Sequence, residues 1–429
     1  MRLPGRLAAA IEVLSDVETR HRPVSEALKA WGINNRFAGA GDRAAIGNLV
    51  YDALRRRASH AAAMGSDSPR ALVLAVAMRD WGETPDSLAA AFEGDSHAPE
   101  ALTPEEIAGA TADLSSAPAA ARADMPEWLV PSLERAFGHD WSAEGAAMAG
   151  RPSLDLRANA LKASPEKVMK SLARFSPQPT TIAPFGITMP AGPRDARTPN
   201  VTTDEGYQKG WFEVQDQGSQ IVAMLAGARE SEQVLDLCAG AGGKTLVLAA
   251  TMGNKGQIFA YDADRSRLAP IYDRLKRNMV RNAQVRSPQD GALDDLIGKM
   301  DRVVVDAPCT GTGTWRRRPD TKWKLTPELL AQRQSEQAAL LVEAARYLKP
   351  GGTLVYITCS ILPEENDDQI AAFLAGHPGF ETVDITVAWR QTLITDLPEG
   401  LATSGGGICL TPRRTGTDGF YCHLLRNKG

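Results

Sequence analysis

The sequence predicts a doubly wound α/β domain with a mostly parallel sheet, preceded by a separate all-helical domain. Val303–Val305 and Leu354–Ile357 are continuous runs of apolar and β-branched residues, which are typical of strands buried on both faces. From Trp211 onward such runs alternate with helix signals, as they do in doubly wound sheets. Residues 7–91 are rich in alanine and lack strand-like runs, which indicates a different class of domain.

Length and composition limit the classes of protein. A chain of 429 residues exceeds the usual size of a single core, so two or three domains are expected. The formal net charge of -4 means that any contact with nucleic acid must come from local basic patches. The five cysteines show neither CxxC nor Cys/His spacing, which argues against a disulfide framework and against a metal site. No long apolar run occurs, so we expect a cytoplasmic protein that does not span a membrane. We also expect a monomer.

Three domains are predicted along the chain. Residues 1–141 are expected to be helical, because apolar residues such as Leu7, Ile11 and Leu14 share one helical face. Residues 142–205 are expected to form a small α+β insertion, with a strand at 154–159 and a helix that Ser164 caps. Residues 206–429 then form the doubly wound domain.

The elements of the doubly wound domain follow from its apolar runs. Strands are predicted at 234–237, 258–261, 303–306 and 354–358, with another strand ahead of Asp290, and a long amphipathic helix at 327–348. Two late strands near 380–385 and 419–425 form a hairpin that makes one edge of the sheet antiparallel. Ligands of such sheets bind beyond the carboxyl ends of the strands. If the strands ending before Cys309 and Cys359 are neighbours, both thiols overlook one crevice.

The glycine turn in Asp236–Thr245 allows three interpretations. A phosphate-binding loop needs glycine where Cys238 stands, and a dinucleotide fingerprint needs its third glycine at Thr245. The remaining interpretation is S-adenosylmethionine, whose methionine end can use exposed backbone amides. Asp262 would then bind the ribose and Asp290 the adenine amine, although either residue alone could be a helix cap.

Four motifs together carry a resemblance to a known family. They are Asp236–Thr245, Asp306-Ala307-Pro308-Cys309, Arg318–Trp323 and Thr358–Asn366. On these residues the sequence resembles the Sun (Fmu-like) family of RNA cytosine C5-methyltransferases. Within that family it is similar to the bacterial ribosomal RNA small subunit methyltransferase B type, whose N-terminal domain is NusB-like. Gly240-Ala241 departs from the usual Ala-Pro of the family and could loosen the turn.

The resemblance implies a Rossmann-like class I methyltransferase sheet and a set of residue roles. Carbon 5 of cytosine is a weak nucleophile, so a thiolate must first add to carbon 6. The family assigns this addition to Cys359, product release to Cys309 and the cytosine edge to Asp306. A helix from Pro363 would favour the Cys359 thiolate, whereas Glu364 and Glu365 oppose it. The implied residues for S-adenosylmethionine are Cys238, Ala239, Gly240, Ala241, Gly242, Gly243, Lys244, Asp262, Arg267, Asp290 and Asp306.

Basic residues near aromatic ones are candidates for contact with RNA. The first group follows the motif of Cys309, the second is the Arg55-Arg56-Arg57 run, and a third lies on the helix after Asp262. A solvated loop or helix end is the alternative for each group. The candidates are Arg316, Arg318, Asp320, Lys322 and Trp323, then Arg55, Arg56 and Arg57, then Arg274, Lys276, Arg277 and Arg281.

The expected function is methylation of carbon 5 of a cytosine in RNA, most simply 16S ribosomal RNA of the small subunit, with S-adenosylmethionine as cofactor. One alternative is an RNA-binding ribosome assembly factor that keeps the fold without catalysis. Another is a methyltransferase for DNA cytosine or for a small molecule. In the DNA enzymes the nucleophile resembles the Pro-Cys thiol, which is Cys309 in this chain. The two thiols, each within its own motif, favour the RNA methyltransferase.

Overall fold

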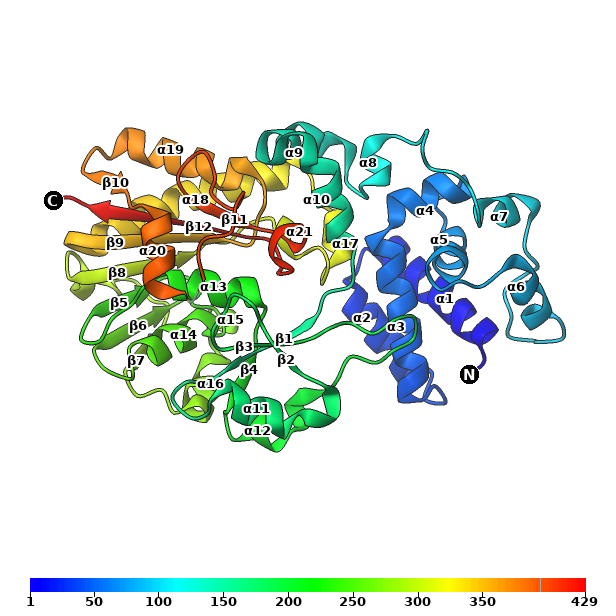
Figure 1. The fold of residues 1–429 in the computed structure, drawn as a ribbon, viewed down its shortest axis with the longest axis horizontal. Helices are drawn as coiled ribbons and strands as arrows, with labels where there is room; N and C mark the ends of the chain where they lie inside the picture. The colour runs from blue at the N-terminus through cyan, green and yellow to red at the C-terminus, as the bar shows by residue number, and fades with distance from the viewer. Residues whose placement is uncertain (394) are drawn as a thin grey trace. The chain divides into compact units, whose positions relative to one another are not determined.

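The computed structural model describes residues 1–393 and 395–429, which divide into two compact units (Figure 1). The helical unit comprises Met1–Pro152, Ala191–Thr198 and Trp315–Lys324. The sheet unit comprises Ser153–Pro190, Pro199–Thr314 and Leu325–Gly429. These limits differ from the predicted boundaries at 141 and 205, because the helical unit continues through the helix α10 (Trp141–Met148) and the α+β segment joins the sheet unit.

The helical unit has an apolar core in which Leu7, Leu14, Ile46, Leu49 and Leu72 are fully buried. Its helices start where the sequence provides N-terminal signals: Ser68 and Thr84 cap helices whose first residue is proline. Its helices are α1 (Leu3–Arg20), α2 (Val24–Asn34), α3 (Ala40–Arg55), α4 (Arg57–Met64), α5 (Pro69–Ala75) continued by a π-turn (Val76–Asp80), α6 (Pro85–Phe92), α7 (Pro104–Gly109), α8 (Ala119–Arg122), α9 (Val130–Phe137), α10 (Trp141–Met148) and α17 (Pro319–Lys322).

A small antiparallel sheet opens the sheet unit. Its strand order is β2 (Gln178–Pro179), β3 (Gly186–Met189), β1 (Leu154–Ala158) and β4 (Phe212–Val214). Leu156, Ile187 and Phe212 are buried between it and α11 (Pro165–Ser171), which Ser164 caps as predicted. Strand β4 lies beyond residue 205, so the small sheet draws on both of the segments that the sequence separated. Helix α12 (Glu205–Gln208) leads into β4.

The large sheet has the order β10-β12-β9-β8-β5-β6-β7, and Figure 1 shows helices on both of its sides. Pairing is parallel from β7 to β9, whereas β12 is antiparallel to β9, and β10 and β11 are antiparallel to β12. The mostly parallel sheet with an antiparallel edge is therefore confirmed. The strands are β5 (Gln233–Asp236), β6 (Gln257–Tyr261), β7 (Ala283–Arg286), β8 (Met300–Asp306), β9 (Leu348–Thr358), β10 (Phe380–Thr382), β11 (Ile408–Leu410) and β12 (Phe420–Asn427).

Successive residues of the central strands face opposite layers of helices. Val304 and Val355 belong to a core with α13, α14 and α20, whereas Val303 and Leu354 belong to a core with α18 and α19. This double burial explains the continuous apolar runs of the sequence. The helices of the sheet unit not yet given are α13 (Gln217–Leu225), α14 (Gly243–Thr251), α15 (Arg265–Leu268), α16 (Ile271–Asn278), α18 (Pro327–Tyr347), α19 (Asp367–Gly376), α20 (Ile385–Thr392) and α21 (Pro412–Thr415).

The order of the sheet locates a ligand crevice. Strand β5 lies between β6, which follows it in the chain, and β8, so the winding of the sheet reverses at this point. Open α/β sheets bind ligands beyond the carboxyl ends of the strands at such a reversal.

Within the described part of the chain, no helix has the length and apolar character needed to cross a membrane. Among the same residues, no three His, Cys, Asp or Glu side chains are grouped as metal ligands.

Candidate active site

The glycine turn joins β5 to α14 at the reversal of the sheet. Gly240 and Gly242 have φ angles of 49° and 82°, which residues with a side chain rarely adopt. A Cβ on Gly242 would also lie 2.5 Å from Cγ1 of Ile271. No side chain caps the start of α14, since the cap residue is Gly242 itself. The first N–H groups of this helix are therefore available to a ligand.

Three of the predicted cofactor residues surround the turn and the end of β6. The buried Asp262 carboxylate accepts hydrogen bonds from the Gly240 N–H and the Asp264 N–H, both at 2.9 Å. A Cβ on Gly240 would lie 3.8 Å from Nη2 of Arg267, so this exposed guanidinium lies beside the turn. Asp290 is exposed in the loop after β7. Burial raises the pKa of Tyr261, and the charges of Glu343, Asp262 and Asp290 raise it further.

Three carboxylates lie near the turn. Asp306 at the end of β8 pairs with the buried Lys244 ammonium at 2.6 Å and keeps about a third of its side chain (34%) exposed. Burial raises the pKa of Asp236 to about 7, although Thr245 donates a hydrogen bond to it. Burial also raises the pKa of Cys238, and the charges of Asp306, Asp262 and Asp236 add to this effect. These carboxylates suit a ligand that places a positive charge beside the turn.

The two thiols meet at the ends of neighbouring strands. Strands β8 and β9 are parallel neighbours, which is the condition for both thiols to face one crevice. The Sγ atoms of Cys309 and Cys359 lie 3.3 Å apart. The hydrogen bond with Cys359 and burial together raise the pKa of Cys309. Either thiol can donate the hydrogen bond between them, and the raised pKa of Cys309 disfavours its thiolate. The carbonyl of Cys359 accepts from the Gly313 N–H at 2.9 Å, which ties the two loops together.

The segment after Cys359 differs from the prediction. Pro363–Glu365 form a single 3-10 turn, and the helix α19 begins only at Asp367. Glu365 does not point at solvent, because its fully buried carboxylate accepts bonds from the Thr310 N–H at 2.8 Å, the Thr310 hydroxyl and the Gln337 amide at 2.9 Å. Glu365 thus fixes the loop that carries Cys309.

Gln337 is a site residue that the sequence interpretation missed. It lies on the apolar face of α18, and its amide also donates to the Pro308 carbonyl at 3.0 Å. A signal was present in the sequence, because Gln337 stands at the helical spacing of the apolar residues Leu330, Leu341 and Ala344. A buried polar residue on an apolar stripe needs a partner, and here the partner is the active-site loop.

Two family models match the chain. The model of the 16S rRNA methyltransferases RsmB/F matches residues 223–426, and the model of the ferredoxin-like domain of RsmF/B-like methyltransferases matches residues 125–192. The chain belongs to the RsmB/F methyltransferase family. The second match covers β1, β2 and β3 of the small sheet, so the family models span both sheets of the sheet unit.

Bacterial relatives support the RsmB/F assignment. The "Probable ribosomal RNA small subunit methyltransferase B" of Synechocystis sp. is 35% identical over 310 residues, which are 70% of this chain and 66% of that protein. The Klebsiella pneumoniae protein named ribosomal RNA small subunit methyltransferase B is 38% identical over 60% of this chain and 58% of its own length. The chain thus spans 58% to 66% of the length of these relatives, less than two thirds.

Solved structures share the RsmB/F fold. The crystal structure of PH0851 covers 99% of both chains with a TM-score of 0.74 at 23% identity. NSun6 from Pyrococcus horikoshii, solved with SFG, covers 71% of this chain and 99% of its own at a TM-score of 0.61 and 21% identity. The Rossmann-like sheet and its helical preceding region are thereby confirmed as the fold of this chain.

Most of the candidate RNA contacts in this RsmB/F protein are structural, which corrects the expectation. The fully buried Lys322 ammonium donates to the carbonyls of Arg55 and Asp124 at 2.9 and 2.7 Å. Trp323 donates its indole N–H to the Leu54 carbonyl at 2.7 Å. Burial lowers the pKa of Lys322 to about 8. Aromatic and basic residues next to one another here build the helical unit instead of an RNA surface.

The remaining candidates of the helical unit are partly engaged as well. Arg316 and Asp320 are buried, and so is Arg55, which pairs with Asp52 at 2.8 Å. Arg57 pairs with Glu18 at 2.9 Å and Arg56 with Asp80 at 2.7 Å, although Arg56 stays half-exposed. Arg318 is exposed. Arg55, Arg56 and Arg57 are therefore all held in ion pairs of the bundle, the one of Arg55 buried, while Arg318 and Arg56 remain accessible.

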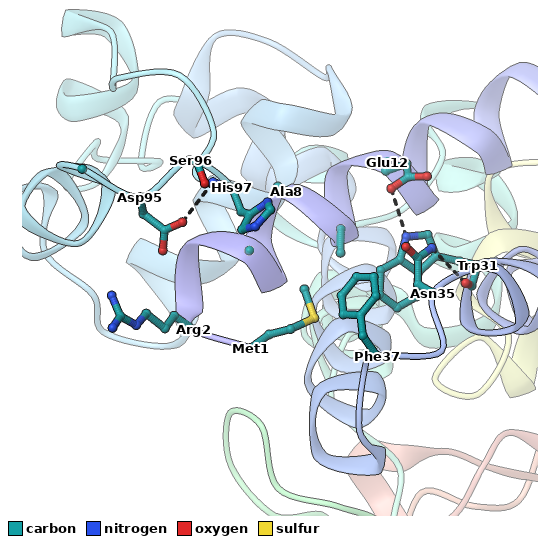
Figure 2. Close-up of a pocket in the computed structure, with 13 residues that line it drawn as sticks. Met1, Arg2, Ala8, Glu12, Trp31, Asn35, Phe37, Asp95, Ser96 and His97 are labelled. Carbon is teal, nitrogen blue, oxygen red and sulfur yellow. Dashed lines mark hydrogen bonds between the residues drawn. The ribbon is translucent and has the colours of Figure 1, made fainter.

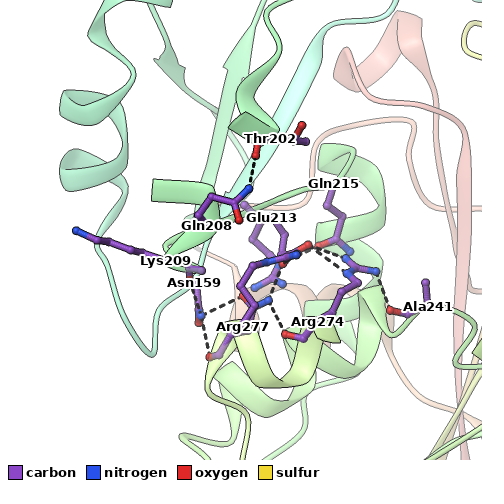
Figure 3. A network of polar contacts seen from close by, with 12 residues as sticks. Asn159, Thr202, Gln208, Lys209, Glu213, Gln215, Ala241, Arg274 and Arg277 are labelled. Carbon is purple, nitrogen blue, oxygen red and sulfur yellow. Dashed lines mark hydrogen bonds and ion pairs between the residues drawn. The ribbon is translucent and has the colours of Figure 1, made fainter. Parts of the chain in front are cut away.

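The third basic group divides in two. Lys276 and Arg281 are exposed, whereas Arg274 and Arg277 turn towards Glu213 of the small sheet, as Figure 3 shows. A hollow of the helical unit, about 740 Å³ and drawn in Figure 2, is lined by none of the predicted site residues. Its Glu12 already accepts the indole N–H of Trp31 at 2.9 Å, and Asp95 the N–H of His97.

Proposed function

We propose that this RsmB/F protein transfers a methyl group from S-adenosylmethionine to carbon 5 of a cytosine in small-subunit ribosomal RNA. The observation that carries the proposal is the pair of thiols, 3.3 Å apart, at the ends of the strands that also present Asp306. Membership of the family supports the reaction class and the substrate class. The carboxylates around the glycine turn support a sulfonium cofactor, whose positive charge they attract.

The cofactor would lie along the carboxyl ends of β5 and β6. The uncapped N-terminus of α14 suits its carboxylate, and Asp262 retains lone pairs for the ribose hydroxyls. Arg267 and Asp290 border the same region and stay exposed. When bound, S-adenosylmethionine supplies an activated methyl group, and every other step falls to side chains of this chain.

Cys359 begins the reaction by adding its thiolate to carbon 6 of the cytosine, which makes carbon 5 nucleophilic. Asp306 accepts a hydrogen bond from the amino edge of the base, and the Lys244 ammonium paired with it stabilises the negative charge that develops on the ring. After methylation, loss of the carbon 5 proton to a base expels the Cys359 sulfur and restores the double bond. Cys309, next to that sulfur, assists this release. Lys244 holds the Asp306 carboxylate in place meanwhile.

Two rival functions remain testable. A DNA-type enzyme would use the Pro-Cys thiol as nucleophile, but burial and Cys359 raise the pKa of Cys309, which disfavours its thiolate. An RNA-binding assembly factor would need no reactive thiol at all.

RNA would contact the accessible basic residues, and we assign the contacts with its phosphates to Arg318, Arg56, Lys276 and Arg281.

The test uses the two alanine variants with radiolabelled cofactor and ribosomal RNA. Cys359→Ala cannot form the carbon 6 adduct, so it should give neither methylated RNA nor a protein–RNA band on a denaturing gel. Cys309→Ala should add and methylate but release slowly, so a labelled protein–RNA band should accumulate. A band with Cys359→Ala that disappears with Cys309→Ala would reverse the roles and favour the DNA-type mechanism. Unchanged methylation in both variants would overturn the proposal.

A further inference from the structure

Arg274 lies between the small sheet and the glycine turn, as Figure 3 shows. Its Nη1 donates to the Ala241 carbonyl at 2.8 Å, while Nε and Nη2 donate to Oε2 of Glu213 at 3.2 and 2.9 Å. Arginine is suited to this arrangement, because its planar guanidinium can hold a carboxylate on one edge and a carbonyl on another. Helix α16 thus links β4 of the small sheet to the loop that follows β5.

Glu213 is a fixed anchor for this link. Only 2% of it is exposed, and it also accepts bonds from Arg277 and Asn278, both at 2.5 Å. Burial alone would raise the pKa of Glu213, but Arg274, Arg277 and Asn278 hold it below its usual range. The carboxylate is therefore ionised at neutral pH, and its position is set by the cross-strand pairing of β4 with β1.

The turn needs such an anchor. Ala241 stands between Gly240 and Gly242, both in the left-handed region, and glycine gives the backbone many alternative conformations. The N–H groups at the start of α14 follow directly, so a shift of the Ala241 peptide moves them as well. Holding the Ala241 carbonyl restricts the turn before a ligand arrives, which lowers the entropy lost on binding.

We propose that Arg274 is a positioning residue for the cofactor turn and that the small sheet, through Glu213, holds this turn in its binding conformation. The inference rests on the proposed function for the identity of the ligand. Arg274 touches neither the thiols nor Asp306 in the contacts described above. Its effect should therefore fall on cofactor affinity and leave the chemical step and RNA binding unchanged.

Arg277 offers a matched control for the experiment. It pairs with the same Glu213 carboxylate, but its guanidinium lies over the Tyr207 ring instead of contacting the turn. In the full-length protein, Arg274→Met should weaken binding of S-adenosylhomocysteine, measured by calorimetry, about tenfold. The KM for S-adenosylmethionine should rise similarly, while kcat and RNA affinity stay the same. Arg277→Met should stay within about twofold of the natural chain in all of these.

Three outcomes would separate the possibilities. Equal loss of affinity in the two variants would assign the effect to general loss of Glu213 pairing and overturn the positioning role. Affinity unchanged in Arg274→Met, with the natural chain binding well, would overturn it too. Failure of the natural chain to bind S-adenosylhomocysteine would instead refute the proposed function, on which this inference depends.

A rescue variant makes the test independent of folding stability. Proline fixes φ near about −65°, so Ala241→Pro restricts the turn without Arg274. Introduced into Arg274→Met, it should restore cofactor affinity to within about threefold of the natural chain. If Ala241→Pro alone binds normally and the double variant still binds weakly, loss of turn rigidity is not the cause and the proposal is wrong.

Discussion

At the scale of single residues, burial decides whether a cation is structural or available. Lys322 has two carbonyl partners and no solvent exposure. Lys322→Met should leave both carbonyls without a donor and destabilise the protein by about 2 kcal/mol. Urea unfolding would measure the loss, and the RNA affinity of the folded variant should be unchanged.

The exposed Arg318 is the matched control for Lys322. Arg318→Met should leave the free energy of unfolding within about 0.5 kcal/mol of the natural chain. It should, however, reduce the slope of log Kd against log salt for RNA by about one unit if it contacts a phosphate. A reduced salt slope in Lys322→Met instead would reinstate the RNA role that the structure argues against.

His423 should make stability depend on pH. It is fully buried between Thr382 and Tyr421, and burial lowers its pKa to about 4, although the charge of Asp367 opposes this. Between pH 6.5 and 4 the unfolded chain binds a proton that the folded chain does not, so stability falls as the pH falls.

His423→Gln removes this titration. Between pH 7 and pH 4 the free energy of unfolding of the natural chain should therefore fall by on the order of 3 kcal/mol more than that of the variant. Urea unfolding at a series of pH values measures it. A constant difference over that range would show that His423 does not titrate as its burial requires.

The sequence predicted the places of the two thiols and of Asp306 better than it predicted the residues that hold the Cys309 loop. Cys309, Cys359 and Asp306 each close an apolar run, so their strand ends could be read from the sequence, and the structure brings the two thiols together. Glu365 was interpreted only as a charge near Cys359. Its actual partners, Thr310 and Gln337, come from other elements, and such contacts depend on packing that no local pattern records.

At the scale of elements, two loops cross without room for a side chain. A Cβ on Gly313 would lie 2.1 Å from the Gly419 carbonyl oxygen, which is backbone and cannot yield easily. Gly313→Ala should therefore separate the Cys309 loop from β12, lower the unfolding temperature by several degrees and reduce methylation strongly.

Gly376 provides the comparison. It ends α19, and a Cβ there would meet nothing within 4 Å, so Gly376→Ala should stabilise the protein by about 0.5 kcal/mol. Differential scanning calorimetry compares the two variants. Equal unfolding temperatures would show that the crossing at Gly313 adapts to a methyl group.

Elements with a clear apolar pattern were predictable, even when they are short. Strands β5, β6 and β8 and helix α18 lie close to their predicted bounds, and the three-residue β10 lies within the predicted 380–385. Strand β9 begins at Leu348 instead of at 354, and for β7 only a strand ahead of Asp290 was expected. Strand β11 has three residues and the 3-10 turn at Pro363 has three, so neither carries a periodic signal. Strand β11 is held by its pairing with β12, and the 3-10 turn is held by the buried polar contacts of Glu365.

At the scale of the whole molecule, the compact units are discontinuous in sequence. A composition shift can mark a linker, but it cannot reveal that Trp315–Lys324 returns to the helical unit. The same limit applies to β4, which pairs with β1 although more than fifty residues separate them. Boundaries drawn from sequence therefore cut through the small sheet.

Fragments should reflect this. A fragment of residues 206–429 lacks β1 and β3 and so exposes Phe212 and Glu213, which are buried in the full chain. It should bind S-adenosylhomocysteine at least tenfold more weakly than a fragment of residues 153–429, because the Glu213 anchor loses its strand partner. Calorimetry on both fragments tests this, and equal affinities would show that the small sheet does not support the turn.

The order of the large sheet also determines when its strands can pair during translation. Strand β9 ends at Thr358, next to Cys359, but its neighbour β12 begins only at Phe420. At usual rates of translation, roughly 3 to 12 seconds separate the two segments as they leave the ribosome. During that interval β9 has an open edge, and the loop of Cys309 lacks the Gly419 contact. The nascent chain therefore acquires its thiol crevice last, after the cofactor turn and the helices that cover the sheet have been made.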